Sequence, residues 1–263
     1  FRMKATYQEL DFRNLPRYSI TEASRYLLIP VGTLRSWIHG RSYPTVGGKR
    51  YFQPLINLPD MEVKQLSFIN LVEAHVLRAI RKEIRLDQVR TALNYIEQRF
   101  NVPHPLARIE FQTDGVDLFV NLVGYLVNGS QPGQVEMQKV IENLRDLPPS
   151  PWYQRSNIQL KMQTVLENLL RRIEWDENGV AIKLFPFIRS TESLTEESPK
   201  TLVIDPRISF GRPVLVGTEI PTAMLAQRYK AGESIDNLAE DYGFDRLQVE
   251  EAIRCELSLY QAA

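Results

Sequence analysis

Cysteine is almost absent from this sequence: Cys255 is the only one among 263 residues. A single cysteine excludes an internal disulfide framework and fits a reducing cytoplasm. We expect Cys255 to pack as a small apolar residue in the last helix. No stretch approaches the roughly 18 consecutive apolar residues of a membrane span, and the N-terminus shows no signal-peptide pattern. These absences predict a cytoplasmic globular protein.

Motifs for metal binding and catalysis are also lacking. Gly47-Gly48 is not followed by the Lys-Ser/Thr and helix of a phosphate-binding loop. Asp114 and Asp117 surround a turn signal, which favours turn formation over acid–base catalysis. The three histidines are far apart and have no neighbours at metal-ligand spacing: His39, His75 and His104. The sequence therefore predicts a protein that is not an enzyme, with no cofactor, metal or catalytic residue.

Net charge is absent as well, with 32 Lys+Arg and 32 Asp+Glu, but the charges are unevenly distributed. Residues 1–105 carry 16 Lys+Arg and 9 Asp+Glu, whereas residues 106–263 carry 16 and 23. Within residues 17–52 there are six cations and one acid, Glu22. A basic segment favours phosphate binding, because each neutralised phosphate releases counterions. The first third of the chain is therefore the predicted DNA-binding part.

Residues 19–52 contain the pattern of two short helices joined by a tight turn. Ser19 and Glu22 have the spacing of a capping box, in which each side chain bonds the other's backbone N–H. Pro30 ends the first helix at the preceding residue and fits the first turn of the second. In the second helix, the apolar residues recur at helical spacing: Val31, Leu34 and Ile38.

A hairpin is predicted next, over Tyr43–Phe52 around Gly47-Gly48. Two helices followed by a basic hairpin are typical of a winged helix-turn-helix, in which the second helix fits the major groove. The second helix supplies the candidates for base contacts: Thr33, Arg35, Ser36 and His39. The candidates for phosphate contacts are Arg17, Arg25, Arg41, Lys49, Arg50 and Tyr51. Because one short helix reads few base pairs, a homodimer is expected.

The remaining pattern predicts an α+β fold that is mainly α. We expect a winged helix-turn-helix domain over 1–105, a β-rich middle region with inserted helices over 106–189, a linker over 190–201 and a C-terminal domain over 202–263. An antiparallel sheet is expected from residues 106–128 and the hairpin 173–187. The other expected elements are an extended arm over 1–17 and helices over 61–82, 86–100, 135–147 and 158–172.

The last 62 residues read as an independent helix-turn-helix-like unit of opposite charge. They hold 6 cations and 10 acids, and three helices are expected over 221–230, 234–242 and 246–260. So acidic a surface attracts phosphate poorly, and packing or protein binding is the preferred interpretation.

The C-terminal segment resembles the family named domain of unknown function four hundred and thirty-three (DUF433). Its motifs occur here as Asp205-Pro206, Gly211-Arg212-Pro213, Gly217-Thr218-Glu219-Ile220-Pro221 and Ala231-Gly232-Glu233-Ser234. The family usually shows Arg where this chain has Glu219, so a contact made by that Arg is absent or reversed here.

The first part, with LSFINLVEAHVLRAIR and HPLARIEFQTDGVDLFV, is similar to the DNA-binding half of VapB-like antitoxins, and Thr33-Leu34-Arg35-Ser36-Trp37 resembles the second helix of MerR-type regulators. The resemblance implies an antitoxin that binds double-stranded operator DNA, represses its own operon and neutralises a PIN-like ribonuclease toxin. Two alternatives stay open: a MerR-like regulator that holds a small ligand in the middle region without a toxin, and an interaction scaffold that does not bind DNA.

Overall fold

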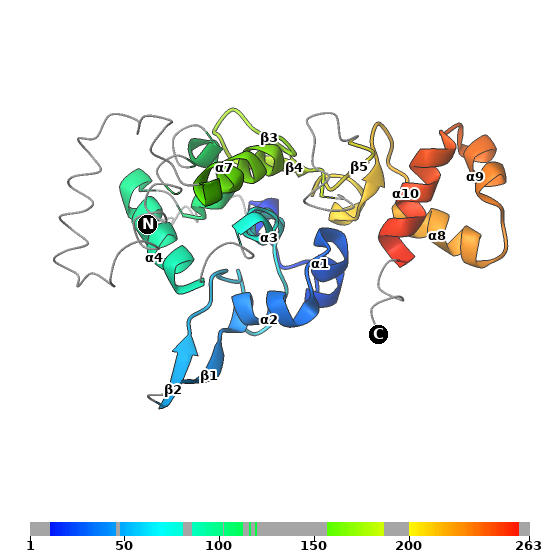
Figure 1. Cartoon of the computed structure of the whole chain (residues 1–263). Coiled ribbons are helices and arrows are strands. Elements are labelled where there is room, and N and C mark those ends of the chain that lie inside the picture. The colour runs from blue at the N-terminus through cyan, green and yellow to red at the C-terminus, as the bar shows by residue number, and fades with distance from the viewer. Residues whose placement is uncertain are drawn as a thin grey trace, which may run out of the picture.

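The computed structural model describes residues 11–45, 48–80, 86–101, 103–112, 116, 119, 157–186 and 200–257. Helices predominate in this part of the chain, and its strands form three two-stranded antiparallel sheets. The predicted α+β, mainly α class is confirmed. Figure 1 gives the labels of the elements.

The helix-turn-helix consists of α1 (Ile20–Leu27) and α2 (Val31–His39). The predicted capping box is present: Ser19 Oγ accepts the Glu22 N–H at 3.2 Å, and the Glu22 carboxylate accepts the Ser19 N–H at 2.9 Å. Leu28 then adopts a left-handed conformation that ends α1, and Pro30 stands at the N-cap of α2. The local sequence thus fixes both helix starts.

The predicted wing is the hairpin of β1 (Arg41–Thr45) and β2 (Gly48–Phe52). Its register pairs Arg41 with Phe52 and Thr45 with Gly48. The hairpin extends away from the body of the protein beside α2 (Figure 1). After it, the N–H groups of Leu55 and Ile56 donate to the carbonyl oxygen of Trp37, at 2.6 and 3.1 Å, and so return the chain to α2.

Three longer helices lie behind the helix-turn-helix and its hairpin: α3 (Phe68–Ile80), α4 (Leu86–Phe100) and α7 (Asn157–Leu170). The bounds predicted for α4 are confirmed, but the start predicted for α3, at residue 61, is wrong. Ser67 and Asn70 cap α3 reciprocally, each side chain accepting the other's backbone N–H, and Lys64 has φ +56°. The apolar residues before Ser67 therefore precede the helix.

The β-rich interpretation of residues 106–112 is also wrong. Pro105–Ala107 is a 3-10 turn, and residues 109–112 are helical, as are Val116 and Phe119. Arg108 alone bridges to Val180 of the downstream hairpin. Phe111 packs edge-on against Phe119, with both rings fully buried and 5.9 Å between their centroids.

The downstream hairpin is present as β3 (Ile173–Trp175) and β4 (Ala181–Leu184). The helix expected over 158–172 corresponds to α7. The helix expected over 135–147, most of the linker and the other strands expected up to residue 128 lie outside the described residues. In the expected N-terminal arm, residues 12–14 form a 3-10 turn instead of an extended strand.

The C-terminal part contains β5 (Leu202–Val203) paired with β6 (Val214–Leu215), followed by three helices. These are α8 (Thr222–Lys230), α9 (Ile235–Tyr242) and α10 (Arg246–Leu257), which confirms the three predicted helices. Ser234 caps α9, and Gly243 ends it in a left-handed conformation, as expected.

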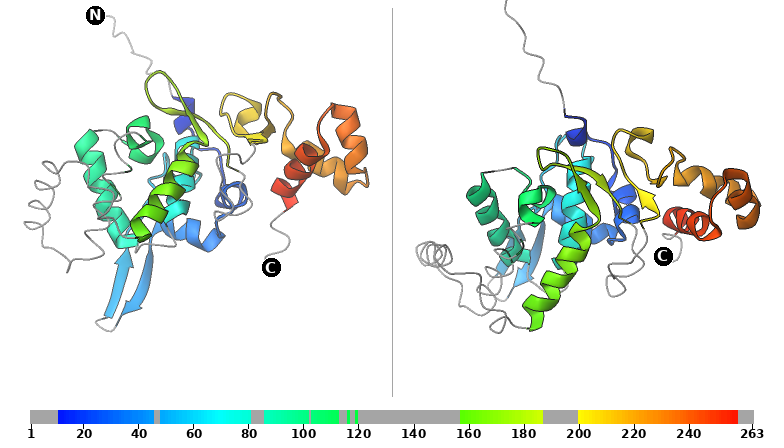
Figure 2. Two further views of the ribbon diagram at one scale, coloured as in Figure 1. Left: turned by 45° about the horizontal axis from the view of Figure 1, so that its top comes forward. Right: turned by 90° about the horizontal axis from the view of Figure 1, so that it is seen from above.

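The C-terminal part contacts the preceding part of the chain. Leu184 of β4 and Ile204 exchange two backbone hydrogen bonds of 3.0 and 2.8 Å, so an isolated bridge next to β5 joins this part to the β3–β4 hairpin. Buried residues of α1, α3, α7 and α10 belong to one continuous hydrophobic cluster. Figure 2 shows β5 beside this hairpin, with α8–α10 beyond it.

Candidate nucleic-acid interface

One side of α2 is anchored in the core, and the other is open to solvent. Trp37 and Leu34 are fully buried, which fixes the rotation of the helix about its axis. That rotation exposes Arg35, whereas Thr33 and His39 are half-buried. A short helix held in this way presents a cation and two hydrogen-bonding side chains, the groups that read base edges.

Ser36 differs from the other three base-contact candidates. It is only 7% exposed, and its hydroxyl donates to the carbonyl oxygen of Thr33 at 2.8 Å. A side chain that bonds the preceding turn has little left for a base. Ser36 is therefore a poor candidate for a base contact.

The wing places further polar groups beside α2. Arg41, Lys49 and Tyr51 are exposed, while Arg50 lies in β2, its side chain outside the described part. The Tyr51 hydroxyl donates to the carbonyl oxygen of His39 at 2.8 Å. This bond satisfies a carbonyl at the end of α2 and joins the wing to that helix.

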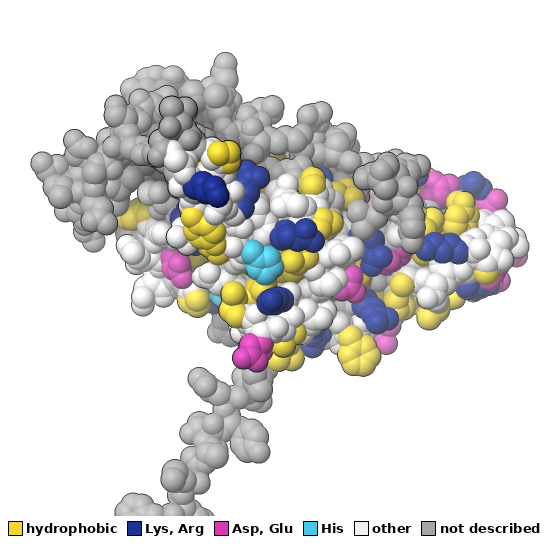
Figure 3. All heavy atoms as spheres, turned by 90° about the horizontal axis from the view of Figure 1, so that it is seen from below, with side chains coloured by type: hydrophobic (Ala, Val, Ile, Leu, Met, Phe, Trp, Pro, Cys, Tyr) yellow, Lys and Arg dark blue, Asp and Glu magenta, His cyan; other side chains and the backbone are white. Residues whose placement is uncertain are grey.

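Several cations lie on this side of the molecule. In Figure 3, which views the molecule from below, Lys and Arg side chains lie near a histidine, with hydrophobic and acidic side chains between them. Among the predicted phosphate contacts, Arg41 and Lys49 remain free of the ion pairs found among the described residues. The basic surface is therefore formed by α2 and the wing.

Arg17 and Arg25, two other predicted phosphate contacts, face the C-terminal part instead. Arg17 Nη1 donates to the carbonyl oxygen of Pro206 at 2.7 Å, across 189 residues of sequence. Arg25 pairs with Glu256 in α10, with 3.1 Å between Nη2 and Oε2. Burial lowers the pKa of Arg25, but the Glu256 carboxylate and the Tyr26 hydroxyl together raise it by more, so the net pKa is raised. Both guanidinium groups therefore hold the two parts of the chain together. Local sequence patterns do not predict this role, because the partners are far away in the sequence.

The family motif residues build the loop from β5 to α8, and part of that loop contacts the helix-turn-helix. Gly211 has φ +74°, and its carbonyl oxygen accepts the buried Tyr18 hydroxyl at 2.9 Å. A Cβ on Gly211 would overlap that hydroxyl oxygen. Arg212 and Glu219 are exposed and Pro213 is buried. Glycine is thus required by both the backbone and the close approach.

Two motif side chains stabilise the loop internally. Asp205, 1% exposed, accepts the Arg207 backbone N–H at 2.9 Å and forms an ion pair with its guanidinium at 2.6 Å. Burial acts to raise the pKa of Asp205, but the bonds from Arg207 lower it overall. Thr218 Oγ1 donates to Leu215 O and accepts the Ile220 N–H, at 3.0 and 3.2 Å. The tight turn has Gly217 at φ +82°, and Pro221 is the N-cap of α8.

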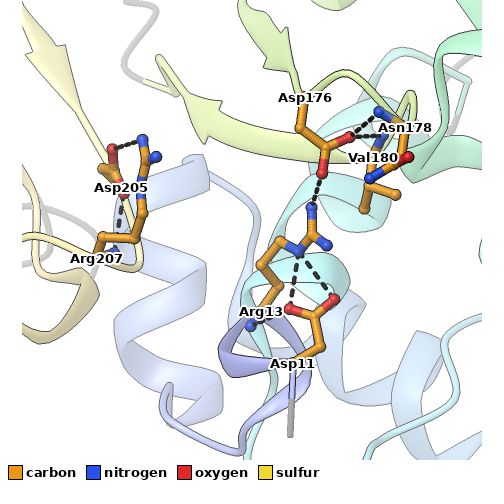
Figure 4. Close-up of polar contacts among 7 residues, drawn as sticks. All are labelled: Asp11, Arg13, Asp176, Asn178, Val180, Asp205 and Arg207. Atoms are coloured by element: carbon orange, nitrogen blue, oxygen red, sulfur yellow. Dashed lines mark hydrogen bonds and ion pairs between the residues drawn. The ribbon is translucent and has the colours of Figure 1, made fainter. Parts of the chain in front are cut away.

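Figure 4 shows a second polar cluster beside the Asp205 pair. Arg13 lies between Asp11 and Asp176, with Nε 2.8 Å from Asp11 Oδ1 and Nη1 2.6 Å from Asp176 Oδ2. Asp176 also accepts the N–H groups of Asn178 and Val180, at 2.9 and 2.8 Å. Burial opposes these bonds, yet the pKa of Asp176 is lowered. The cluster fixes residues 11–14 on the β3–β4 hairpin, which sequence reasoning did not predict.

Within the described ranges, no group of three or more His, Cys, Asp and Glu residues is arranged to hold a metal ion. No helix there is both long and apolar enough to cross a membrane. Cys255 is buried, which raises the pKa of its thiol.

Comparisons with known proteins agree with this architecture. Residues 16–93 match the family described as "Putative DNA-binding HTH domain", and residues 202–254 match the protein family of unknown function DUF433. The chain is 28% identical to "Putative antitoxin VapB45" of Mycobacterium tuberculosis, over 94% of this chain and 96% of that protein. It is 24% identical to the uncharacterized protein Rv2308 of the same organism, over 90% and 88%.

The crystal structure of Rv2018 from Mycobacterium tuberculosis has a similar fold, with a TM-score of 0.59, 24% identity and coverage of 91% of this chain and 97% of that one. The chain is thus similar to a putative DNA-binding helix-turn-helix domain over residues 16–93 and to the DUF433 family over residues 202–254.

Proposed function

We propose that this protein is an antitoxin that binds double-stranded operator DNA through α2 and the wing and represses its own operon. The observation that carries the proposal is the exposed Arg35 on a core-anchored helix, next to a hairpin that carries Arg41 and Lys49. Arg35 and His39 would face base edges, with Thr33 at the margin. The wing cations would contact phosphates.

The antitoxin role is supported by similarity along nearly the whole chain to a protein named as an antitoxin. The partner we propose is a PIN-like ribonuclease toxin, bound by the acidic C-terminal part. Exposed acids there include Asp236, Glu240 and Asp241 on α9 and its end. Asp236 forms a surface ion pair with Arg246, and Asp241 forms one with Arg228. Such a surface complements a cationic nuclease.

We further propose that the functional form is a homodimer. Each copy would present one α2 to one half-site, and paired half-sites lie about one helical turn, roughly 34–36 Å, apart.

Fluorescence anisotropy with a duplex from the upstream promoter region tests the DNA-binding part. Arg35→Ala should reduce discrimination against a scrambled duplex by about 1–3 kcal/mol if Arg35 makes a bidentate base contact. Lys49→Gln should weaken both duplexes alike and lower the salt slope by roughly one. Ser36→Ala should leave both values unchanged, because its hydroxyl is bonded within α2.

If Arg35→Ala and Lys49→Gln both bind as the unmodified protein does, the reading surface is elsewhere. Copurification with the product of the adjacent gene tests the toxin separately. Recovery of specific DNA binding without a nuclease partner would favour a ligand-responsive regulator. Absence of specific DNA binding would favour the scaffold.

A further inference from the structure

A polar cavity of about 180 Å³ lies behind the wing. Its walls come from α3, α4, the segment after β2 and the 3-10 turn at Pro105–Ala107. This volume far exceeds the roughly 10–15 Å³ that a single water needs. The cavity is separate from the DNA-facing surface and from the DUF433 loop.

One wall carries an ion pair between a buried Glu73 and a half-buried His104. Glu73 Oε1 lies 3.0 Å from His104 Nδ1, and Glu73 Oε2 accepts the Asn70 side-chain amide at 3.0 Å. His104 is held in a left-handed backbone conformation, with φ +54°. The bond from Glu73 raises the pKa of His104, against an opposing effect of burial. Protonated His104 has a second N–H, on Nε2, which none of the described residues accepts.

The facing wall carries a cation that is not satisfied. Arg90 of α4 lines the cavity, and its buried Nε has no hydrogen-bond partner among the described residues. Burial lowers the pKa of Arg90, although Glu73 and Glu97 attract it. A buried guanidinium N–H without an acceptor is costly, and the guanidinium group that carries it belongs to a residue at the wall of the cavity, where its positive charge can attract an anion.

The other walls define the remainder of the ligand. Leu55, Leu77 and Leu93 line the cavity and are at most 7% exposed, so they suit a short hydrocarbon tail. Glu97 is an exposed lining residue, and its negative charge disfavours a dianion such as phosphate more than a monoanion. An apolar tail with one carboxylate head meets both conditions.

We propose that this cavity binds a small organic monocarboxylate, whose head accepts hydrogen bonds from Arg90 and whose tail packs on the three leucines. The ligand would also act on DNA binding, because Leu55 belongs to the chain segment that returns from the wing. Its N–H donates to Trp37 O, at the buried side of the recognition helix. The binding site goes beyond the DNA-binding antitoxin role and does not depend on it, whereas the effect on DNA rests on that proposed role.

Binding is measured on the full chain without DNA, by heteronuclear NMR titration with butyrate at constant ionic strength. Butyrate should shift resonances of α4 and of Leu55, while butyramide, of the same shape without charge, should bind at least several-fold more weakly. Arg90→Gln should weaken butyrate binding roughly 10–100-fold, the loss of one charge-assisted hydrogen-bonded contact. Arg254→Gln, on the distant α10, should bind as the unmodified protein does.

Equal binding of butyrate and butyramide, or equal binding by Arg90→Gln, would overturn the site, as would tighter binding of inorganic phosphate than of butyrate. Arg90→Lys, which keeps the cation, should recover part of the affinity, so that a folding defect can be distinguished from loss of the contact. Butyrate should also change the affinity for the promoter duplex in the unmodified protein but not in Arg90→Gln. Binding without that change would overturn the action on DNA, whereas failure of all DNA binding would leave the NMR result standing.

Discussion

Arg25 of α1 and Glu256 of α10 form an ion pair between the helix-turn-helix and the last helix of the C-terminal part, with 3.1 Å between Nη2 and Oε2. Glu256 also accepts the Thr222 hydroxyl at 2.6 Å. Since the Glu256 side chain is 8% exposed, little solvent is available to replace either partner. The pair therefore holds α1 to the last helix.

Arg25→Met should lower the free energy of unfolding by about 1–3 kcal/mol, because it leaves a buried carboxylate with a single neutral donor. Chemical denaturation measures the change. Arg254→Met, which breaks exposed pairs with Glu250 and Glu251, should cost within about 0.5 kcal/mol. Arg25→Met should leave the salt slope of DNA binding unchanged. A slope lower by about one would instead indicate that Arg25 contacts a phosphate.

Gly211→Ala should destabilise the protein by about 1–3 kcal/mol, because alanine is strained at φ +74° and its Cβ meets the Tyr18 hydroxyl. Thermal unfolding measures the loss. Adding Tyr18→Phe to Gly211→Ala should recover only the part of the lost stability that comes from the clash with the hydroxyl. Gly217→Ala is the matched control, since its φ is +82° but nothing lies within 4 Å of the added Cβ. Equal losses at both glycines would mean that the contact with Tyr18 has no energetic weight.

Tyr51→Phe should weaken binding to the promoter duplex several-fold while changing stability by no more than about 1 kcal/mol. The reason is that the lost bond to His39 O orients the wing, yet it lies at an exposed site. Tyr43→Phe removes a hydroxyl from the paired strand β1 and should leave affinity unchanged. Anisotropy at fixed salt compares the two, and a similar effect of both would argue against the bond.

His75 predicts a loss of stability in mild acid. It is fully buried, its Nε2 lies 3.2 Å from Leu169 O, and burial, with Arg78, lowers its pKa to about 3. The unfolded chain takes up a proton near pH 6.5 and the folded one does not, so stability is complete above about pH 6.5 and falls below it, by at most about 1.4 kcal/mol per pH unit.

The measurement is urea unfolding between about pH 6.5 and 5, above most carboxylate titration. His75→Gln, which cannot titrate, should flatten this dependence. His104 has the opposite sign, because its pKa is raised: its contribution is present below about pH 6.5 and is lost as pH rises through the folded value. His104→Gln should therefore leave the acid decline in place, and an unchanged decline in His75→Gln would contradict the assignment.

Local signals predicted the parts of this fold that depend on neighbours in sequence. Ser19 and Glu22 set the start of α1, and Ser234 and Gly243 set both ends of α9. The errors arose where distant contacts decide. The ARIEF segment has strand-forming residues, but burial of Phe111 against Phe119 favours a helical path.

The candidate site divides in the same way. The exposure of Arg35 follows from the helical spacing of buried residues around it. Arg17 and Arg25 were predicted to bind phosphate because they are cations near the helix-turn-helix. Their acceptors, Pro206 O and Glu256, come from the other end of the chain, and nothing in local sequence points to them.

The contacts of Tyr18 with Gly211 and of Arg25 with Glu256 limit how the two parts of this chain can recombine with other proteins during evolution. A recombinant protein that joined this helix-turn-helix to an unrelated C-terminal part would leave the Tyr18 hydroxyl without its acceptor and the Arg25 guanidinium without its ion-pair partner. Joining this C-terminal part to another helix-turn-helix would likewise leave the buried Glu256 carboxylate without the Arg25 cation. Exchange of either part alone is therefore disfavoured unless all four contact partners are exchanged with it, so the helix-turn-helix and the C-terminal part are expected to evolve together.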